Sequence, residues 1–172
     1  ITVPLVLVCW DRPRLRQTLT TIAQIGASLP AVALFPLLVL VAVRKLGGGM
    51  EIASLGLVLT GMIWYPLFNC LGGVATIPTD LVEAMKGLGL NRIQVWKKLV
   101  LPAMGPALVT GTITAWGGGW NALVVSEYVQ HQGLTYQVRG LGSLLDRAVY
   151  EQGDTQAITL CVASMVGWIL LI

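Results

Sequence analysis

Apolar and charged positions alternate in long blocks along this chain. No charged residue occurs from Gln17 to Val43, from Ile52 to Thr79 or from Ala103 to Ser126. Each run is long enough to cross a hydrocarbon core of ~30 Å as a helix, at ~1.5 Å per residue. The pattern therefore predicts three spanning helices. The apolar runs 1–10 and 155–172 are shorter, and we expect them to be parts of two further, truncated spans, the first at its cytoplasmic end.

Prolines are expected to break or kink the first two of these runs, and the alternative for the first part of the run 17–43 is an interfacial segment. Pro30 and Pro36 lie in the first run and Pro66 lies in the second. Because proline lacks an N–H and its ring clashes with the preceding turn, we expect breaks or kinks near these positions.

The segment 79–102, TDLVEAMKGLGLNRIQVWKKLVLP, holds clustered charge between two long apolar runs. Asp80 followed by Glu83 has the form of a capping box, which predicts that a helix starts just after Pro78. Glu83 and Lys86 are three residues apart, so they are expected to pair on the surface of this helix. The segment is therefore the part of the chain best suited to meet water and a partner.

Gly89 and Asn91 divide this segment into two helices. Glycine adopts the left-handed conformation that ends a helix, so the first helix is expected to end at Gly89 and the second to be capped by Asn91. Apolar residues recur at helical spacing in the second helix, with basic residues between them. These basic residues are Arg92, Lys97 and Lys98. Pro102 marks the next interruption of the backbone.

The composition is that of a membrane protein. Hydrophobic residues make up 55% of the chain and charged residues 11%, against roughly a quarter charged in ordinary soluble domains. The net charge of +3 is small and the basic residues are scattered, which is not the pattern of a nucleic-acid-binding protein. Cys9, Cys70 and Cys161 lie singly in apolar runs, without disulfide or metal-site spacing. We therefore expect no cofactor, no metal and no nucleic acid on this chain.

Basic residues predict the orientation. If the spans alternate, seven basic residues fall on one side and four on the other, and the richer side is cytoplasmic. The seven are Arg12, Arg14, Arg16, Lys86, Arg92, Lys97 and Lys98, and the four are Arg44, Lys45, Arg139 and Arg147. Segment 79–102 is then cytoplasmic. The mixed segment 127–154 is expected to be an extracytoplasmic loop with a short amphipathic helix around 141–150.

Segment 79–102 resembles the Glu-Ala-Ala loop of the permeases of bacterial ATP-binding-cassette importers. The residues that carry the resemblance, with matching spacing, are Glu83, Ala84, Met85, Gly89, Leu99, Leu101 and Pro102. Met85 replaces the second Ala of the motif and Leu99 replaces its usual Ile, and both remain apolar. The stretches FPLLVL, WYPLFN, IPTDLVEA and AWGGGWNALVVSEYV are similar to the permeases for small anions of the nitrate, sulfonate and bicarbonate type, especially a duplicated-permease branch.

The resemblance implies a fold, a role and partners. It implies an all-α, polytopic protein of the bacterial inner membrane, in which 1–172 is one permease domain or a fragment of it. In that family the loop is a pair of short cytoplasmic helices that docks on a separate ATPase subunit, which binds ATP and Mg. A second permease domain or copy and an extracytoplasmic substrate-binding protein complete the importer. Glu83, Gly89 and the basic face of the second helix are the residues expected to set the docking.

The span 103–126 carries a candidate pathway face. Thr110, Thr114, Gly117 and Asn121 recur at spacings of four, three and four, so they share one side of a helix. They either line a polar pathway or bond back to their own helix, and the amide of Asn121 needs a partner in hydrocarbon. A neighbouring stripe of small residues suited to packing comprises Gly111, Ala115, Gly118 and Ala122. The run 117–119 of three glycines either loosens the helix for an anion or allows a close helix crossing.

Other classes of protein fit less well. A secondary transporter or channel without an ATPase would be expected to carry ionisable residues inside its spans, and an intramembrane enzyme needs a nucleophile with a base, paired acids or metal ligands at membrane depth. The long apolar runs contain neither set. The phosphate-loop motif is absent, so the chain is not itself the ATPase. Glu127 is expected to be a solvated end charge. The alternative is that it contacts a binding protein or shapes the outer gate. His131 is given no role.

Overall fold

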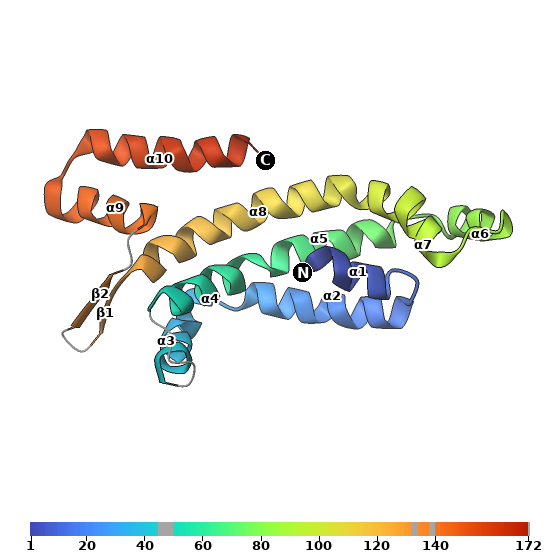
Figure 1. The fold of residues 1–172 in the computed structure, drawn as a ribbon, viewed down its shortest axis with the longest axis horizontal. Coiled ribbons are helices and arrows are strands. Elements are labelled where there is room, and N and C mark those ends of the chain that lie inside the picture. The colour runs from blue at the N-terminus through green and yellow to red at the C-terminus, as the bar shows by residue number, and fades with distance from the viewer. Residues whose placement is uncertain (45–49, 132–133, 138–139, 172) are drawn as a thin grey trace. The chain divides into compact units, whose positions relative to one another are not determined.

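The computed structural model describes residues 1–44, 50–131, 134–137 and 140–171. These residues are largely helical, with one short hairpin (Figure 1). The chain divides into two compact units, which are described separately. One comprises Ile1–Ser28 with Ile63–Thr114, and the other Leu29–Met62 with Ala115–Ile172.

The first unit is built around α5. Its elements are α1 (Thr2–Cys9), α2 (Pro13–Ser28), α5 (Trp64–Ala75), α6 (Thr79–Gly87), α7 (Arg92–Val95), the π-helical segment Trp96–Val100 and the first part of α8 (Leu101–Glu127). Helices α1 and α2 pack on α5, and small residues allow close approach. A Cβ on Gly26 of α2 would lie 2.6 Å from the Trp64 ring, and one on Gly73 of α5 would lie 2.7 Å from Cβ of Ala107 in α8.

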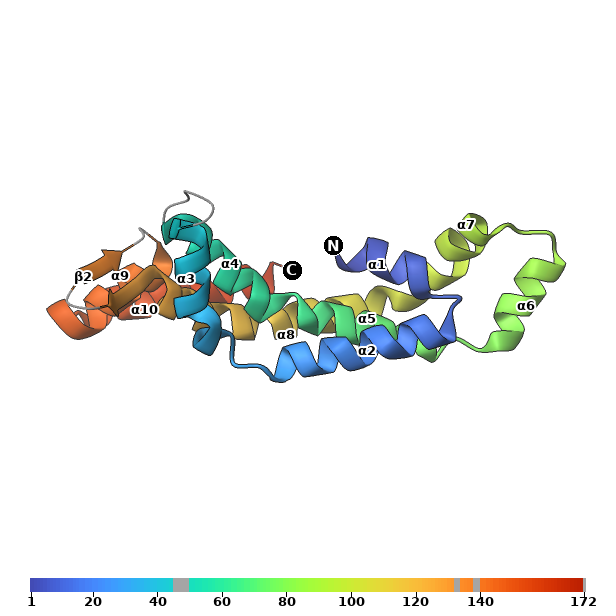
Figure 2. The same ribbon diagram turned by 90° about the horizontal axis from the view of Figure 1, so that it is seen from below.

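The core of this unit brings together residues from all parts of its sequence. Its fully buried members include Val6, Cys9, Cys70, Val95, Val100 and Met104. The π-helical segment therefore lies against the core on one side, where Trp96 and Val100 are buried. Helix α6 has no buried residue, and it stands apart from α2 and α5 in both views (Figures 1 and 2).

The second unit combines helices with the hairpin. Its elements are a 3-10 turn (Ala31–Leu34), α3 (Phe35–Arg44), α4 (Met50–Met62), the last part of α8, β1 (Tyr128–His131), β2 (Leu134–Gln137), α9 (Leu141–Arg147), a π-helical segment (Ala148–Gln152) and α10 (Thr155–Leu170). Phe35, Ala53, Leu57 and Ala122 form its core. The hydroxyl of Ser54 in α4 donates to that of Ser126 in α8 at 2.8 Å.

The helices that are long and apolar enough to cross a membrane follow the predicted runs. Glu51–Ala75 and Arg92–Glu127 pass this criterion, and a third span results if α2 and Ala31–Val39, broken at 29–30, are counted as one. The break falls where Pro30 predicted it. The second run is interrupted near Pro66, as expected, because α4 ends at Met62 and α5 begins at Trp64. Pro66 itself lies in the first turn of α5, where proline is tolerated.

The segment 127–154 is more structured than a loop. Strands β1 and β2 form an antiparallel hairpin in which Tyr128 pairs with Gln137 and His131 with Leu134. The expected short helix is present as α9 and the π-helical segment that follows it. The hairpin is an addition to the predicted all-α fold, because four-residue strands leave too short an alternation to be recognised in the sequence.

Candidate functional site

Helix α6 begins where it was predicted to begin, but without the predicted cap. Pro78 occupies the N-cap position and makes no side-chain capping bond. Thr79 is already helical and its hydroxyl lies 3.4 Å from the Asp80 carboxylate. The predicted capping box of Asp80 and Glu83 is therefore wrong. Proline provides the extended backbone that precedes the helix, so a capping side chain is not required there.

The turn after α6 is a Schellman motif centred on Gly89. Gly89 has φ of +79°, its N–H donates to the Lys86 carbonyl at 2.9 Å, and the Leu90 N–H donates to the Met85 carbonyl at 3.2 Å. These are the two bonds that close such a turn. The predicted helix end at Gly89 is confirmed.

The second helix begins with a full capping box. The Asn91 side chain accepts from the Gln94 N–H at 2.9 Å, and the Gln94 side chain accepts from the Asn91 N–H at 2.8 Å. This confirms Asn91 as the cap. Together the Schellman turn and the capping box fix the conformation of the four-residue connection 88–91 between α6 and α7.

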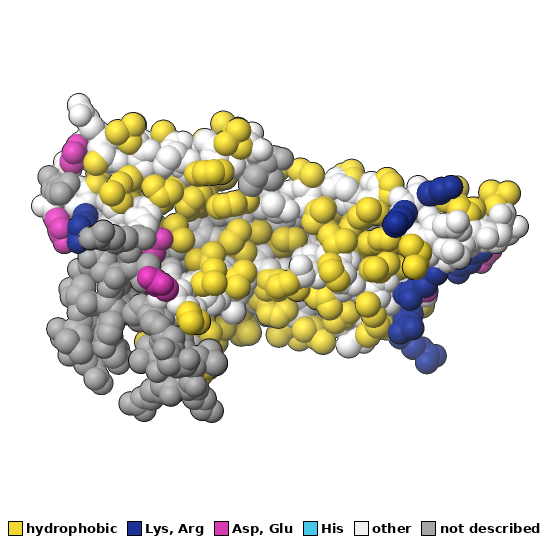
Figure 3. Space-filling model, viewed as in Figure 1, with side chains coloured by type: hydrophobic (Ala, Val, Ile, Leu, Met, Phe, Trp, Pro, Cys, Tyr) yellow, Lys and Arg dark blue, Asp and Glu magenta, His cyan; other side chains and the backbone are white. Residues whose placement is uncertain are grey.

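Arg92 is engaged within the chain. One of its guanidinium nitrogens donates to the carbonyls of Leu7 and Val8, both at 3.0 Å, and pairs with the Asp11 carboxylate at 2.8 Å. Arg92 therefore ties the start of α7 to the end of α1. Lys97 and Lys98, which were expected to share a docking face with it, are exposed. Lys and Arg side chains gather at this end of the first unit (Figure 3).

The outer surface of segment 79–102 is exposed and partly apolar. Glu83, Ala84 and Gly89 are exposed, whereas Met85 is half-buried and packs on the core. Leu81 and Leu88 are 50% and 80% exposed. Of the remaining motif residues, Leu99 lies in the π-helical segment and is half-buried. Leu101 and Pro102 begin α8 and are exposed.

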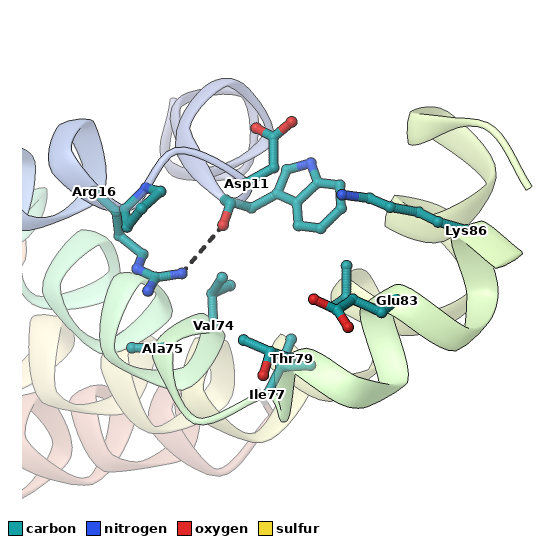
Figure 4. Close-up of a pocket in the computed structure, with 11 residues that line it drawn as sticks. Asp11, Arg16, Val74, Ala75, Ile77, Thr79, Glu83 and Lys86 are labelled. Carbon is teal, nitrogen blue, oxygen red and sulfur yellow. Dashed lines mark hydrogen bonds between the residues drawn. The ribbon is translucent and has the colours of Figure 1, made fainter.

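A pocket of about 260 Å³ lies beneath α6 (Figure 4). Its walls include Glu83 and Lys86 of α6, Arg16 of α2 and Val74 of α5. Arg16 donates to the Trp10 carbonyl at 3.1 Å. Glu83 and Lys86 form no ion pair with each other in the described structure, so their predicted pairing is wrong. Both side chains border the pocket instead.

The predicted pathway residues of α8 are all exposed, and three of them bond to their own helix. Thr110 donates to the Pro106 carbonyl at 3.0 Å and Thr114 to that of Thr110 at 2.9 Å. The Asn121 amide donates to the Gly117 carbonyl at 3.2 Å. These bonds satisfy the hydroxyls and one amide proton and leave the second amide proton of Asn121 available.

The stripe of small residues beside this face of α8 packs against neighbouring helices, as predicted. Gly111, Ala115 and Ala122 are buried, and a Cβ on Gly111 would lie 2.7 Å from Cα of Pro66. Helix α8 continues through the glycine run 117–119, and a Cβ on Gly119 would lie 2.6 Å from the Met62 sulfur. The close-crossing interpretation of these glycines is the one that the structure supports.

Glu127 is buried, not solvated. It is 6% exposed, and its carboxylate accepts the Ser143 N–H at 2.9 Å. A Cβ on Gly140 would overlap with the Glu127 carboxylate, so the glycine makes room for it. Glu127 therefore provides the acceptor for the start of α9, a tertiary contact that its position at a helix end did not reveal.

Within the described ranges, no group of three His, Cys, Asp or Glu side chains is placed to hold a metal ion.

Lys45 and Arg139, two of the residues counted for orientation, lie outside the described residues. Apolar helices of spanning length define this chain as part of a helical membrane protein, and segment 79–102 is an exposed two-helix loop with basic residues.

Comparison with known proteins identifies the family. Residues 6–172 match the family described as the binding-protein-dependent transport system inner membrane component, and the chain belongs to it. It is 30% identical over 156 residues to the nitrate import permease protein of Leptolyngbya laminosa, a match that covers 90% of this chain and 52% of that protein. It is 28% identical over 134 residues to the taurine transport system permease protein of Escherichia coli, covering 77% and 47%.

A third relative is the bicarbonate transport system permease protein of Synechococcus elongatus, 30% identical over 110 residues, which cover 64% of this chain and 37% of that protein. The chain thus spans about half the length of the curated relatives it matches, or less. The resemblance found in segment 79–102 and the anion-permease type are both in agreement with these relatives.

Proposed function

We propose that this chain is part of the transmembrane permease of an ATP-driven importer for a small anion, held in the bacterial inner membrane by several spans. The observation that carries the proposal is the exposed pair of helices in segment 79–102. Its sequence has the family's register from Glu83 to Pro102, and its turn is built on Gly89 with φ of +79°. The chain itself is non-catalytic and binds no cofactor in this proposal.

The partners follow from the family to which the chain belongs. Cytoplasmic ATPase subunits bind segment 79–102, an extracytoplasmic substrate-binding protein delivers the solute, and a second permease domain or copy completes the pathway. Leu81 and Leu88, 50% and 80% exposed, give α6 an apolar ridge of the kind that helices place in a partner's groove. Differential binding of this ridge to two forms of the ATPase would bias the permease between two states.

The substrate class rests on the relatives. The nitrate, taurine and bicarbonate permeases named above serve anions or a zwitterion bearing a sulfonate. We propose a small inorganic or organic anion for this chain too. A channel or secondary transporter without an ATPase is the alternative, and no observation on the described residues favours it over the importer.

Co-purification of the full-length protein with its candidate ATPases in lipid tests the proposal. The native protein is compared with a Glu83→Ala, Gly89→Trp double variant. Gly105→Ala is the matched control, because a Cβ there meets no atom within 4 Å. We expect the native and control proteins to retain the ATPase and the double variant to lose it. If the native protein binds no ATPase, the channel alternative replaces the importer.

A further inference from the structure

Helix α2 carries a polar stripe that no part of the described structure covers. Residues at spacings of three, four, three and four are all exposed, and they are Arg14, Gln17, Thr21, Gln24 and Ser28. These spacings place them on one side of the helix. The opposite side packs on α5 through buried Ala23 and Gly26. The stripe therefore points away from the core of the unit.

The stripe runs alongside a helix of membrane-spanning length and composition. At one end of α2, Arg16 lines a pocket with Val74 and Ala75 of α5. At the other end, Gly26 contacts Trp64 of α5. Because α5 belongs to the apolar span Glu51–Ala75, α2 runs beside a membrane helix for ten residues, or ~15 Å at ~1.5 Å per residue. That is about half of a ~30 Å hydrocarbon core.

The two glutamines are the informative residues of the stripe. Within the described residues, neither the Gln17 nor the Gln24 side-chain amide has a hydrogen-bond partner. Thr21 and Ser28 instead donate to the carbonyls of Gln17 and Ile25, at 3.1 and 2.7 Å. An amide without partners is unfavourable in hydrocarbon, so this side of α2 needs water or another polar surface rather than lipid.

A shallow groove begins at the arginine end of this stripe. Its lining residues are Arg14, Gln17, Thr18, Thr21 and Ile22. The side-chain amides of Gln17 and Gln24 each offer two N–H donors and carry no charge. The two residues lie ~10 Å apart along the axis of α2. Uncharged donors bind an anion weakly enough to release it, and Arg14 attracts negative charge toward the cytoplasmic end.

We infer that this side of α2, from Arg14 to Ser28, lines the translocation route and contacts the transported anion through Gln17 and Gln24. The inference rests on the proposed function and adds specific residues to it. Its occupant is a small hydrated anion. A protein partner packed over the stripe is the alternative outcome of the test below.

Cysteine accessibility tests this inference in the full-length protein, reconstituted with its ATPase and with its native cysteines replaced. Single variants Thr21→Cys and Gln24→Cys are exposed to the anionic thiol reagent sulfonatoethyl methanethiosulfonate. Val109→Cys is the control, since Val109 is 49% exposed but lies in α8, outside the stripe and its groove. We expect the two stripe positions to react at least tenfold faster than position 109, and nitrate, sulfonate or bicarbonate to slow them when transported.

Arg14→Gln gives a second, independent readout. In the Thr21→Cys background it should lower the ratio of rates for the anionic reagent and a cationic analogue by about two- to tenfold, because a charge roughly 10 Å away is removed. A structural role of Arg14 would change both rates alike.

Three results overturn the inference. They are equal reactivity at positions 21, 24 and 109, no reactivity at positions 21 and 24 as expected for a protein interface, or an unchanged ratio in Arg14→Gln. ATP-driven uptake is measured in the same vesicles. If uptake occurs but the accessibility pattern is absent, the inference about α2 is wrong and the proposed function stands. If the unsubstituted protein shows no uptake with its ATPase, the proposed function is wrong.

Discussion

Arg92 shows how a residue expected to serve a partner can instead organise its own chain. Its sequence position, beside Lys97 and Lys98, indicated a basic docking face. In the structure it reaches two carbonyls at the end of α1 and the Asp11 carboxylate. A carboxyl-terminal helix end is a favourable place for a cation. Arg92 thus ties the loop to α1, whereas Lys97 and Lys98 are exposed and have no such contact among the described residues.

Replacing Arg92 should weaken this attachment. We expect Arg92→Gln to lower the free energy of unfolding by about 1 kcal/mol, because the contact is partly exposed and such pairs contribute modestly. Thermal unfolding of the purified protein measures the effect, and Lys98→Gln, which removes the same charge from an exposed site, is the control. Equal melting temperatures for the two variants would contradict the role given to Arg92.

Glu127 gives a prediction of the same kind on the other unit. Glu127→Ala removes a buried acceptor and leaves the Ser143 N–H without its partner, at a cost of about 1–3 kcal/mol. We expect faster hydrogen exchange of the amides of α9, and a smaller change in Glu127→Gln, which keeps an acceptor oxygen. Glu151→Ala alters an exposed carboxylate nearby and should leave the exchange unchanged. Protection of α9 in Glu127→Ala equal to that of the native protein would refute the contact's importance.

At the scale of elements, the α5–α8 crossing depends on Gly111. A methyl group there would lie 2.7 Å from Cα of Pro66 and 3.0 Å from the Tyr65 carbonyl oxygen, and backbone cannot yield as a side chain does. We expect Gly111→Ala to destabilise the protein by about 1–3 kcal/mol. Gly105→Ala in the same helix meets nothing within 4 Å and should be neutral or stabilising. The measurement is thermal unfolding in detergent, and a native-like melting temperature for Gly111→Ala would disprove the close crossing.

These elements also show what the sequence could predict. Long uncharged runs predicted α5 and α8 because hydrocarbon tolerates only helices with satisfied backbones. Gly89 and Asn91 predicted the loop's turn and cap because both act through local backbone geometry. The Arg92–Asp11 pair joins residues 81 positions apart, and no local pattern indicates such a contact. The exposed glutamines of α2 were likewise passed over, because an uncharged run was interpreted as uniformly apolar.

For the whole molecule, the proposed coupling to an ATPase depends on the turn at Gly89. A β-branched residue at φ of +79° is strained by ~1–2 kcal/mol or more, so the Schellman turn should rearrange and change the angle between α6 and α7. We expect Gly89→Val to reduce ATP-driven uptake at least tenfold in proteoliposomes of the complete complex, while ATP hydrolysis continues.

Gly87→Ala is the matched control for this variant. Gly87 ends α6, and a Cβ there meets no atom within 4 Å, so uptake should stay within about twofold of native because a helix accepts alanine more readily than glycine. Membrane abundance and the melting temperature of both variants separate uncoupling from misfolding. If Gly89→Val transports at the native rate, the loop does not depend on this turn, and coupling must pass through the exposed faces of α6 and the lysines without a fixed angle between them.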